Sequence, residues 1–222
     1  MNVDPVLLQT LPSLGKITEL ATRQLAIGSV ITKIFTDNGY NPPVLVGGMA
    51  VSVYTQGMYK THDLDLLTYS TKLVDLMTQL GYARQGKDYV NEVLASYVEF
   101  PTPTDFPSEE RLREYVVPET GLPIYIIGLE DLILDRMGSY SATNSSQCYE
   151  WAFKLTGAFY SYIDWSYLHR KAHKLGILDQ VNRMQRSVKG NLKQLGLLGN
   201  KETSAAQDPR TVHPSSTPMR LF

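Results

Sequence analysis

The sequence predicts an α+β fold in which a small mixed sheet with flanking helices is followed by a C-terminal helical lobe. Up to about residue 127, short apolar runs end at glycine or alternate with polar residues, as strands do. From Gly128 onward, apolar residues recur at helical spacing instead. The chain has 222 residues, of which 43% are hydrophobic, which is enough apolar material for one large core or for two lobes.

The first part of the chain alternates helices with strands. A helix is expected over residues 16–38, because the apolar side chains keep a helical period and Asn38-Gly39 closes it. Val44-Leu45-Val46 is a buried-strand signal that stops at a glycine pair. The other elements expected here are a helix over 49–56, a strand over 63–67, a helix over 73–80, strands over 89–92 and 96–102, and a hairpin of 114–117 with 123–127.

The second part of the chain is predicted to be helical and then disordered. Leu129, Ile133 and Met137 fall on one stripe of a helix. Residues 200–222 are rich in Ser, Thr and Pro and have few apolar anchors, which predicts a disordered tail. Three further helices are expected over 146–160, 165–175 and 177–188.

Several classes of protein are disfavoured by composition. Cys148 is the only cysteine, so no intrachain disulfide can form, as is usual in a reducing compartment. No apolar run reaches the roughly 18 residues that a membrane span needs, and no basic segment followed by an apolar one marks a signal peptide. We therefore expect a soluble cytoplasmic protein with no membrane partner.

Charge is unevenly distributed along a chain whose formal net charge is −1. Between Asp105 and Asp135 there are eight acids and two bases, whereas between Arg170 and Lys193 there are seven bases and one acid, Asp179. A basic cluster in an otherwise slightly acidic chain indicates a polyanionic partner for the C-terminal part, although most such clusters are only solvated helix faces.

The segment from Gly47 to Leu67 carries the chemistry. Gly47 and Gly48 stand between a predicted strand and a predicted helix, where backbone N–H groups can approach a phosphate closely. Asp63 and Asp65 lie two apart on a predicted strand, so they point to the same face. Two adjacent carboxylates repel each other, and a cation between them relieves the repulsion. Mg²⁺ suits such a site because it takes one or two carboxylates together with substrate phosphates.

This segment resembles the Gly-Gly/Ser … Asp-x-Asp signature of the DNA polymerase β-like nucleotidyltransferase superfamily. The resemblance is nearest to the small bacterial type, which includes abortive-infection and toxin–antitoxin nucleotidyltransferases. Tyr59 stands where those enzymes have an arginine, and Lys60 beside it is the basic residue that could substitute. The matching residues are Gly47, Gly48, Ala50, Thr61, Asp63 and Asp65.

The resemblance implies a third carboxylate on a neighbouring strand. Glu99, flanked by strand-forming residues, is the best candidate, with Asp88 and Glu92 as weaker alternatives. Asp63, Asp65 and Glu99 would then be both the metal ligands and the catalytic residues, with Glu99 able to act as general base. Two Mg²⁺ ions are implied, with Mn²⁺ as the alternative metal.

The resemblance also implies residues that bind the nucleotide. Besides the glycine pair, these are Lys60, Thr61 and Arg136. Arg136 lies on a predicted helix that resembles a helix of these small enzymes, in which a basic residue faces the nucleotide. Arg136 could instead pair with an acid of its own helix, Asp131 or Asp135. Gln147 lies in a region where these small enzymes usually carry another acidic residue.

Together these residues imply transfer of NMP from an NTP to a hydroxyl acceptor. The acceptor could be an RNA or tRNA 3′ end, or a protein, and the enzyme could be a toxin with an antitoxin protein as its partner. Two alternatives stay open: an inactive relative that binds and regulates, and an aminoglycoside-type enzyme that modifies a small molecule. We assign residues 1–127 to a nucleotidyltransferase catalytic lobe, 128–199 to a helical lobe and 200–222 to the tail.

Overall fold

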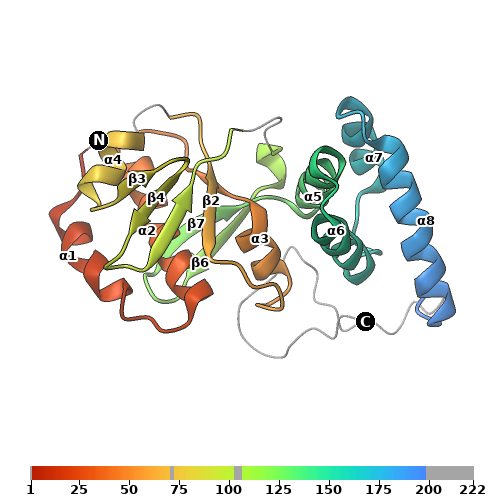
Figure 1. Ribbon diagram of the computed structural model, residues 1–222, viewed down its shortest axis with the longest axis horizontal. Helices are drawn as coiled ribbons and strands as arrows, with labels where there is room; N and C mark the ends of the chain where they lie inside the picture. The colour runs from red at the N-terminus through yellow and green to blue at the C-terminus, as the bar shows by residue number, and fades with distance from the viewer. Residues whose placement is uncertain (1, 71–72, 103–106, 199–222) are drawn as a thin grey trace. The chain divides into compact units, whose positions relative to one another are not determined.

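The computed structural model describes residues 2–70, 73–102 and 107–198. It confirms the predicted α+β class: a mixed sheet with flanking helices precedes a helical region (Figure 1). The predicted disordered tail at 200–222 lies outside the described residues. No helix of the described ranges is long and apolar enough to cross a membrane.

The sheet has seven strands in the order β3-β4-β5-β2-β1-β7-β6. Pairs β2/β5 and β1/β7 are parallel, and the other four pairs are antiparallel. The strands are β1 (Val44–Leu45), β2 (Asp63–Leu67), β3 (Ala83–Gln85), β4 (Asp88–Asn91), β5 (Ser96–Glu99), β6 (Arg113–Val117) and β7 (Leu122–Ile126).

Eight α-helices flank or follow the sheet in the described ranges. The helices are α1 (Pro5–Leu14), α2 (Leu20–Asp37), α3 (Gly47–Tyr54), α4 (Leu73–Gln79), α5 (Leu129–Thr143), α6 (Ser146–Ala158), α7 (Trp165–Lys174) and α8 (Leu178–Gln194). A short 3₁₀ turn, Glu109–Arg111, precedes β6.

The structure adds α1, β3 and the 3₁₀ turn to the predicted elements and ends one predicted strand early. Helix α1 starts at an Asp4 side-chain cap and runs through Pro12, a residue that argues against a helix when only the sequence is considered. Strand β3 is only three residues long, too short for a clear period. The strand expected over 96–102 ends at Glu99 and was wrong beyond it, because Pro101 has no N–H to donate to a ladder.

Helix α2 covers one face of the sheet and thereby decides which side chains face outward. A Cβ at Gly28 would lie only 2.7 Å from Ile124 Cδ1 and 3.4 Å from Leu64, so the helix lies very close to the strands. The α2 residue Gln24 donates to the His62 carbonyl at 2.9 Å and accepts from Ser96 Oγ at 2.8 Å. Since Leu64 points toward α2, its neighbours on the strand point to the opposite face.

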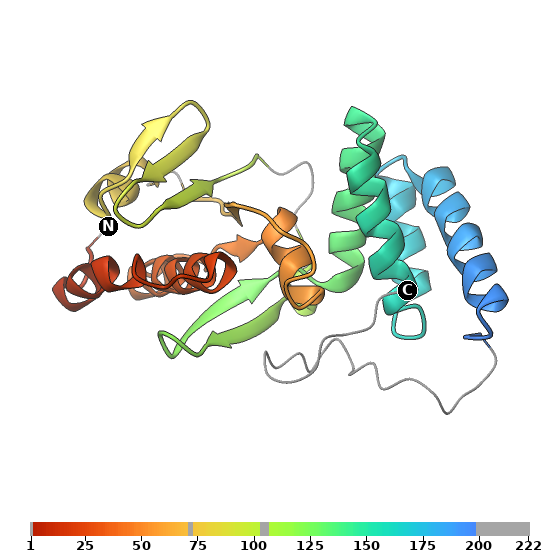
Figure 2. The ribbon, with the colours of Figure 1, turned by 60° about the horizontal axis from the view of Figure 1, so that its bottom comes forward.

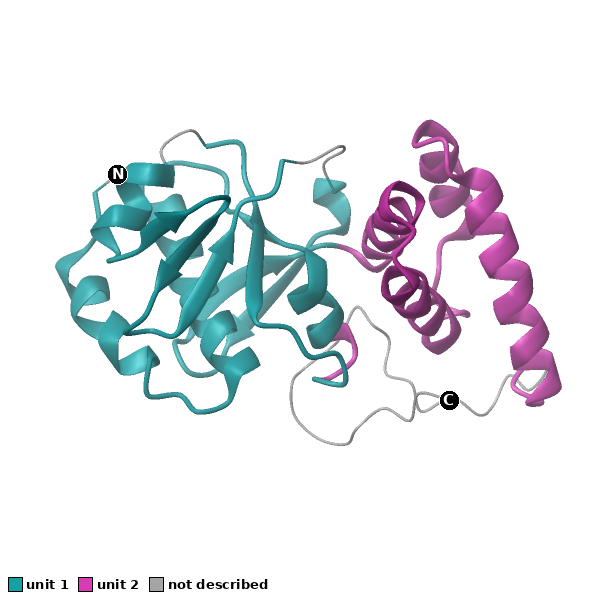
Figure 3. Ribbon diagram, viewed as in Figure 1, with its two compact units in different colours: residues 1–53, 57–127 teal, residues 54–56, 128–222 magenta. Residues whose placement is uncertain are grey.

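The described chain forms two compact units (Figure 3). One contains residues 1–53 and 57–127, with the whole sheet, and the other contains residues 54–56 and 128–222. In the second unit, α5 to α8 lie side by side (Figure 2). Phe159 is fully buried there, with its ring 6.1 Å from that of Tyr54. The assignment of a catalytic and a helical lobe to these ranges stays a prediction.

Candidate functional site

Strand β2 presents two carboxylates on one face. Leu64 and Leu66 are fully buried, while Asp63 is exposed and Asp65 half-buried, so the strand has an apolar side and an acidic side. The Asp63 carboxylate makes no hydrogen bond or ion pair with any residue that the structure describes. A solvated, unpartnered carboxylate contributes nothing visible to the fold and is accessible to a ligand.

The neighbouring strand β5 adds a third carboxylate to the same face. The parallel register pairs Asp65 with Glu99 and Asp63 with Tyr97, and side chains opposite each other on adjacent strands share a face. Glu99 is itself an ion-pair acceptor: Lys87 Nζ lies 2.7 Å from its Oε2. The predicted trio Asp63, Asp65 and Glu99 is thus brought to one face of two adjacent strands.

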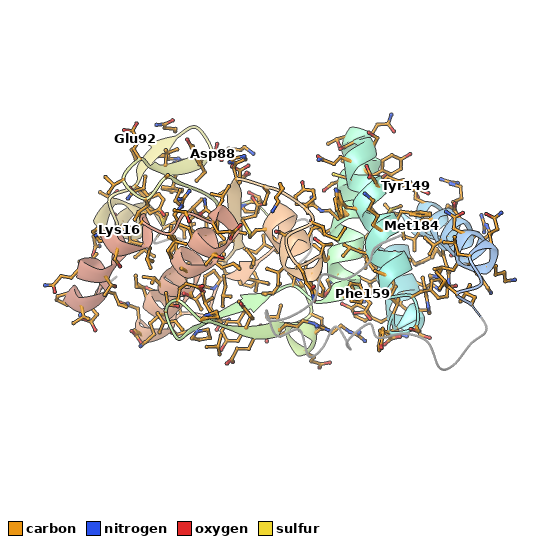
Figure 4. All side chains as sticks on the ribbon, turned by 90° about the horizontal axis from the view of Figure 1, so that it is seen from below. Lys16, Asp88, Glu92, Tyr149, Phe159 and Met184 are labelled. Atoms are coloured by element: carbon orange, nitrogen blue, oxygen red, sulfur yellow. The ribbon has the colours of Figure 1, made fainter. Side chains whose placement is uncertain are left out.

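The two weaker candidates for the third carboxylate lie near the two ends of β4, and Figure 4 labels both. Asp88 opens β4 and is the register partner of Glu99, whereas Glu92 follows the far end of that strand. Asp88 therefore lies beside the trio and Glu92 does not.

The donor chemistry of this face fits a hard divalent cation. Carboxylate oxygens on neighbouring strands are what Mg²⁺ or Mn²⁺ binds in sites shared with phosphates. Over the described ranges, no three His, Cys, Asp or Glu side chains are already gathered tightly enough to form a metal cluster. In this arrangement Lys87 pairs with one of the three carboxylates, Glu99.

A glycine turn lies directly against Asp65. Val46 N donates to the Asp65 carbonyl at 3.0 Å, which places the next residue, Gly47, beside the Asp65 side chain. Gly47 has φ +62°, and a Cβ there would overlap Asp65 Oδ2 and lie 2.8 Å from Cγ. Only glycine satisfies both the backbone conformation and the close approach. The sequence therefore fixes the Asp65 carboxylate beside the N-terminus of α3.

The second glycine is covered by the segment that precedes β2. A Cβ at Gly48 would lie 2.8 Å from Tyr59 Cε1 and 3.0 Å from Thr61 Oγ1. The predicted phosphate-binding residues Gly48 and Thr61 are thus brought together, and Tyr59, which stands where the similar enzymes have arginine, packs on the same glycine.

Two predicted nucleotide-binding residues are placed differently. Lys60 is exposed, and its positive charge acts on Glu19. Burial raises the pKa of the Glu19 carboxyl, whereas hydrogen bonds from Thr22 and Ala21 and the charge of Lys60 lower it, and the net shift is downward. Arg136 belongs to the second unit and donates from Nε and Nη2 to Asp135 Oδ2 at 3.0 and 2.6 Å. The intrahelical pairing of Arg136 is therefore observed, and its contact with a nucleotide stays a prediction.

A family model with the description "nucleotidyltransferase of unknown function" (DUF6036) matches residues 23–188. The chain belongs to this family. The match spans the glycine turn, β2, β5 and most of the helical region, so the nucleotidyltransferase part of the resemblance is confirmed. The toxin–antitoxin type stays a prediction. Comparison with curated proteins and with solved structures gave no match.

Sequence reasoning about this nucleotidyltransferase missed Lys87. The residue is adjacent to the acidic face only because β3 and β4 form a tight hairpin, and β3 was not predicted. The sequence does contain a signal for this hairpin, because Gly86-Lys87, between Gln85 and Asp88, has glycine first, as two-residue hairpin loops often do.

A second acidic pair, at the start of α5, has different surroundings. Asp131 is 4% exposed, and its Oδ1 accepts from Tyr167 Oη at 2.6 Å and from Lys171 Nζ at 3.0 Å. Glu130, also buried, accepts from the backbone N–H of Asp164 at 2.9 Å. These acids connect α5 to α7 and to the loop before it, and we assign them to the fold of the second unit.

Proposed function

We propose that this protein transfers NMP from an NTP to a hydroxyl acceptor in a reaction that depends on a divalent metal. The observation that carries the proposal is the face shared by Asp63, Asp65 and Glu99, with Gly47 against Asp65. A glycine turn at a helix N-terminus suits a phosphate, and carboxylates beside it suit the cation that accompanies the phosphate.

Each residue has a role in this proposal. Asp63 and Asp65 would hold the ions, two Mg²⁺ or Mn²⁺, and Glu99 would complete the site and accept the proton of the attacking hydroxyl. The bound metal would neutralise the triphosphate and favour the hydroxyl in its ionised form. The backbone at Gly47 and Gly48 would approach the phosphates. Lys60, Thr61 and Arg136 are further proposed contacts to the nucleotide.

The proposal is tested by incubating the purified protein with each NTP, labelled at the α-phosphate, together with Mg²⁺ and total cell RNA or lysate. We expect label to move from one or more NTPs to an acceptor, with pyrophosphate released, and to stay on the NTP when Asp63→Asn is used. NTP binding that depends on metal but releases no pyrophosphate would support the inactive binding protein instead. A labelled small molecule would support the aminoglycoside-type alternative.

RNA is the acceptor that the charges of the second unit favour, with a tRNA 3′ end as the specific form. Helix α8 buries Val181, Met184, Val188 and Leu192 along one stripe, so its other face is solvated. Six exposed cations on α7 and α8 make no hydrogen bond or ion pair with any described residue, whereas Lys154 and Lys171 do. The six are Arg170, Lys174, Arg183, Arg186, Lys189 and Lys193.

Binding of RNA as a function of salt tests this acceptor. Replacing Arg183, Arg186 and Lys189 by Gln should flatten the slope of log K against log salt by about 2 to 3, since each neutralised phosphate contributes about 0.7 to 0.9. Lys33→Gln, which removes an exposed lysine that pairs with Asp37 in the other unit, is the control and should leave the slope unchanged. An unchanged slope in the triple variant means that the basic face is only solvated.

We further propose a toxin role, with an antitoxin protein as partner, which rests on the resemblance alone. We expect expression of the wild type to arrest growth and expression of Asp63→Asn to leave it normal. Equal growth would remove the toxin role without affecting the transferase proposal.

A further inference from the structure

A two-residue hairpin loop brings a lysine to the carboxylate face. Gln85 pairs with Asp88 across β3 and β4, so only Gly86 and Lys87 form the turn. Gly86 has φ +65°, which glycine adopts without strain and which suits the first central position of such a loop. Because Asp88 is in turn the register partner of Glu99, the turn places Lys87 next to the edge of the candidate site.

The ammonium group of Lys87 lies where several carboxylates meet. Its Nζ is 2.7 Å from Glu99 Oε2, and the strand registers place Asp88 and Asp65 on either side of Glu99. The three acids belong to β5, β4 and β2. A single positive charge therefore partly neutralises an acidic face shared by three strands.

The Lys87–Glu99 pair differs from the other lysine pairs of the protein. Lys33–Asp37 and Lys154–Glu150 join residues one turn apart on a helix, and Lys171–Asp131 joins two helices of the second unit, whereas Lys87–Glu99 joins the β3–β4 turn to β5 and ends on a proposed metal ligand. The Lys87 side chain is 73% exposed and that of Glu99 is 19% exposed, and solvent and salt weaken an ion pair whose cation is open to water. A divalent cation can displace it easily.

We propose that Lys87 is a movable counter-ion: it neutralises Glu99 before metal binds, and it pairs with the triphosphate once metal and nucleotide are present. This inference rests on the proposed function. Glu99 could pair with either an ammonium or a metal ion, so Lys87 would leave Glu99 when a metal ion was bound there. The polyphosphate beside the metal attracts it, and the flexible lysine stem with three donors permits the move.

The first half of the proposal is tested by titrating Mn²⁺ into the protein without nucleotide, with binding measured by calorimetry. Lys87→Met should bind Mn²⁺ about two- to fivefold more tightly, the ratio that corresponds to an exposed pair. In a Glu99→Gln background the same change should have no effect, because the contested carboxylate is gone. Lys33→Met, which breaks an exposed pair far along the sequence, is the matched control and should bind as the wild type does.

The second half is tested with inorganic triphosphate in the presence of Mg²⁺. Lys87→Met should bind it about fivefold more weakly, as expected for loss of one exposed charge-assisted hydrogen bond. Lys87→Arg, which keeps the charge, should restore most of the affinity. Opposite effects of one substitution on metal and on triphosphate are not expected of a purely structural lysine.

The outcomes separate this inference from the proposed function. If the wild type binds Mn²⁺ through Asp63, but Lys87→Met binds metal no more tightly or triphosphate no more weakly, the counter-ion role is overturned and the transferase proposal stands. If the wild type binds no Mn²⁺, both are overturned. Tighter metal binding together with weaker triphosphate binding supports the counter-ion.

Discussion

The two acidic pairs of this protein, Asp63 with Asp65 on β2 and Glu130 with Asp131 on α5, have similar chemistry and opposite surroundings. Asp63 is exposed and unpartnered among the described residues, and Asp65 lies against a glycine turn. Glu130 and Asp131 are buried and accept hydrogen bonds from α7 and the loop before it. Buried charges persist only when paired, so the α5 pair serves the fold, while Asp63 of the β2 pair remains accessible to a ligand.

The largest effect that distinguishes the pairs is expected on activity. Asp63→Asn should lower NMP transfer by about 10²–10³-fold, the usual consequence of losing one preorganised charge-stabilising group. Its free energy of unfolding should stay within about 0.5 kcal/mol of the wild type, because the side chain is exposed. Transfer is measured with labelled NTP, and stability by urea unfolding. Full activity in a folded variant would remove Asp63 from the site.

The next largest effect should be on stability, in the other pair. Asp131→Ala removes the buried carboxylate that accepts from Tyr167 and pairs with Lys171, and should lower the free energy of unfolding by about 3 kcal/mol. Urea unfolding at 25 °C measures this. Asp131→Asn, which can still accept from Tyr167, should lose less. If the free energy of unfolding of Asp131→Ala equals that of the wild type within experimental error, the buried network does not stabilise the second unit.

Two glycines of the first unit have positive φ but different surroundings. Gly47→Ala should cost about 1–3 kcal/mol of stability and also impair transfer, because its Cβ pushes the Asp65 carboxylate aside. Gly39 has φ +73° with nothing within 4 Å of an added Cβ, so Gly39→Ala should show the backbone cost without the loss of activity. Equal activity in the two variants would mean that the glycine turn does not position Asp65.

The smallest effect is a dependence of stability on alkaline pH. Burial, with the hydrogen bond and charge of Asp131, raises the pKa of Tyr167 to about 12 against the opposing charge of Lys171. A group whose pKa is higher in the folded than in the unfolded protein stabilises the folded state fully at pH values below its unfolded pKa, which is near 10. This contribution to stability is lost as the pH rises toward 12. Tyr167→Phe should therefore show a shallower fall in unfolding free energy from pH 10 to pH 12. An unchanged fall would assign the alkaline transition to other groups.

Local features were predictable from the sequence, and long-range pairings were not. The strand 63–67 and the sharing of one face by Asp63 and Asp65 follow from residue spacing over a few positions. A helix was expected over 49–56, after the glycine pair, whereas α3 spans Gly47–Tyr54 and includes both glycines. That Glu99 lies beside Asp65 needs the register of β5 on β2, which spacing alone does not give.

The partners of the charged residues were the least predictable part. Asp131 pairs with residues 36 and 40 positions away, because two helices pack together rather than because of any local period. Lys87 reaches Glu99 through a hairpin whose first strand is only three residues long. Sequence periodicity shows which side of an element is buried, but the ion pairs depend on how elements meet.

A calorimetric titration of Mg²⁺ into the wild type, Asp63→Asn and Asp131→Asn distinguishes the roles of the two acidic pairs. The acids on β2 are proposed to bind metal and those on α5 to maintain the fold. We therefore predict that Asp131→Asn, in its folded range, binds Mg²⁺ as the wild type does, and that Asp63→Asn loses at least about tenfold in affinity, roughly 1.4 kcal/mol. Equal binding by the wild type and Asp63→Asn, or loss of binding only in Asp131→Asn, would contradict the account.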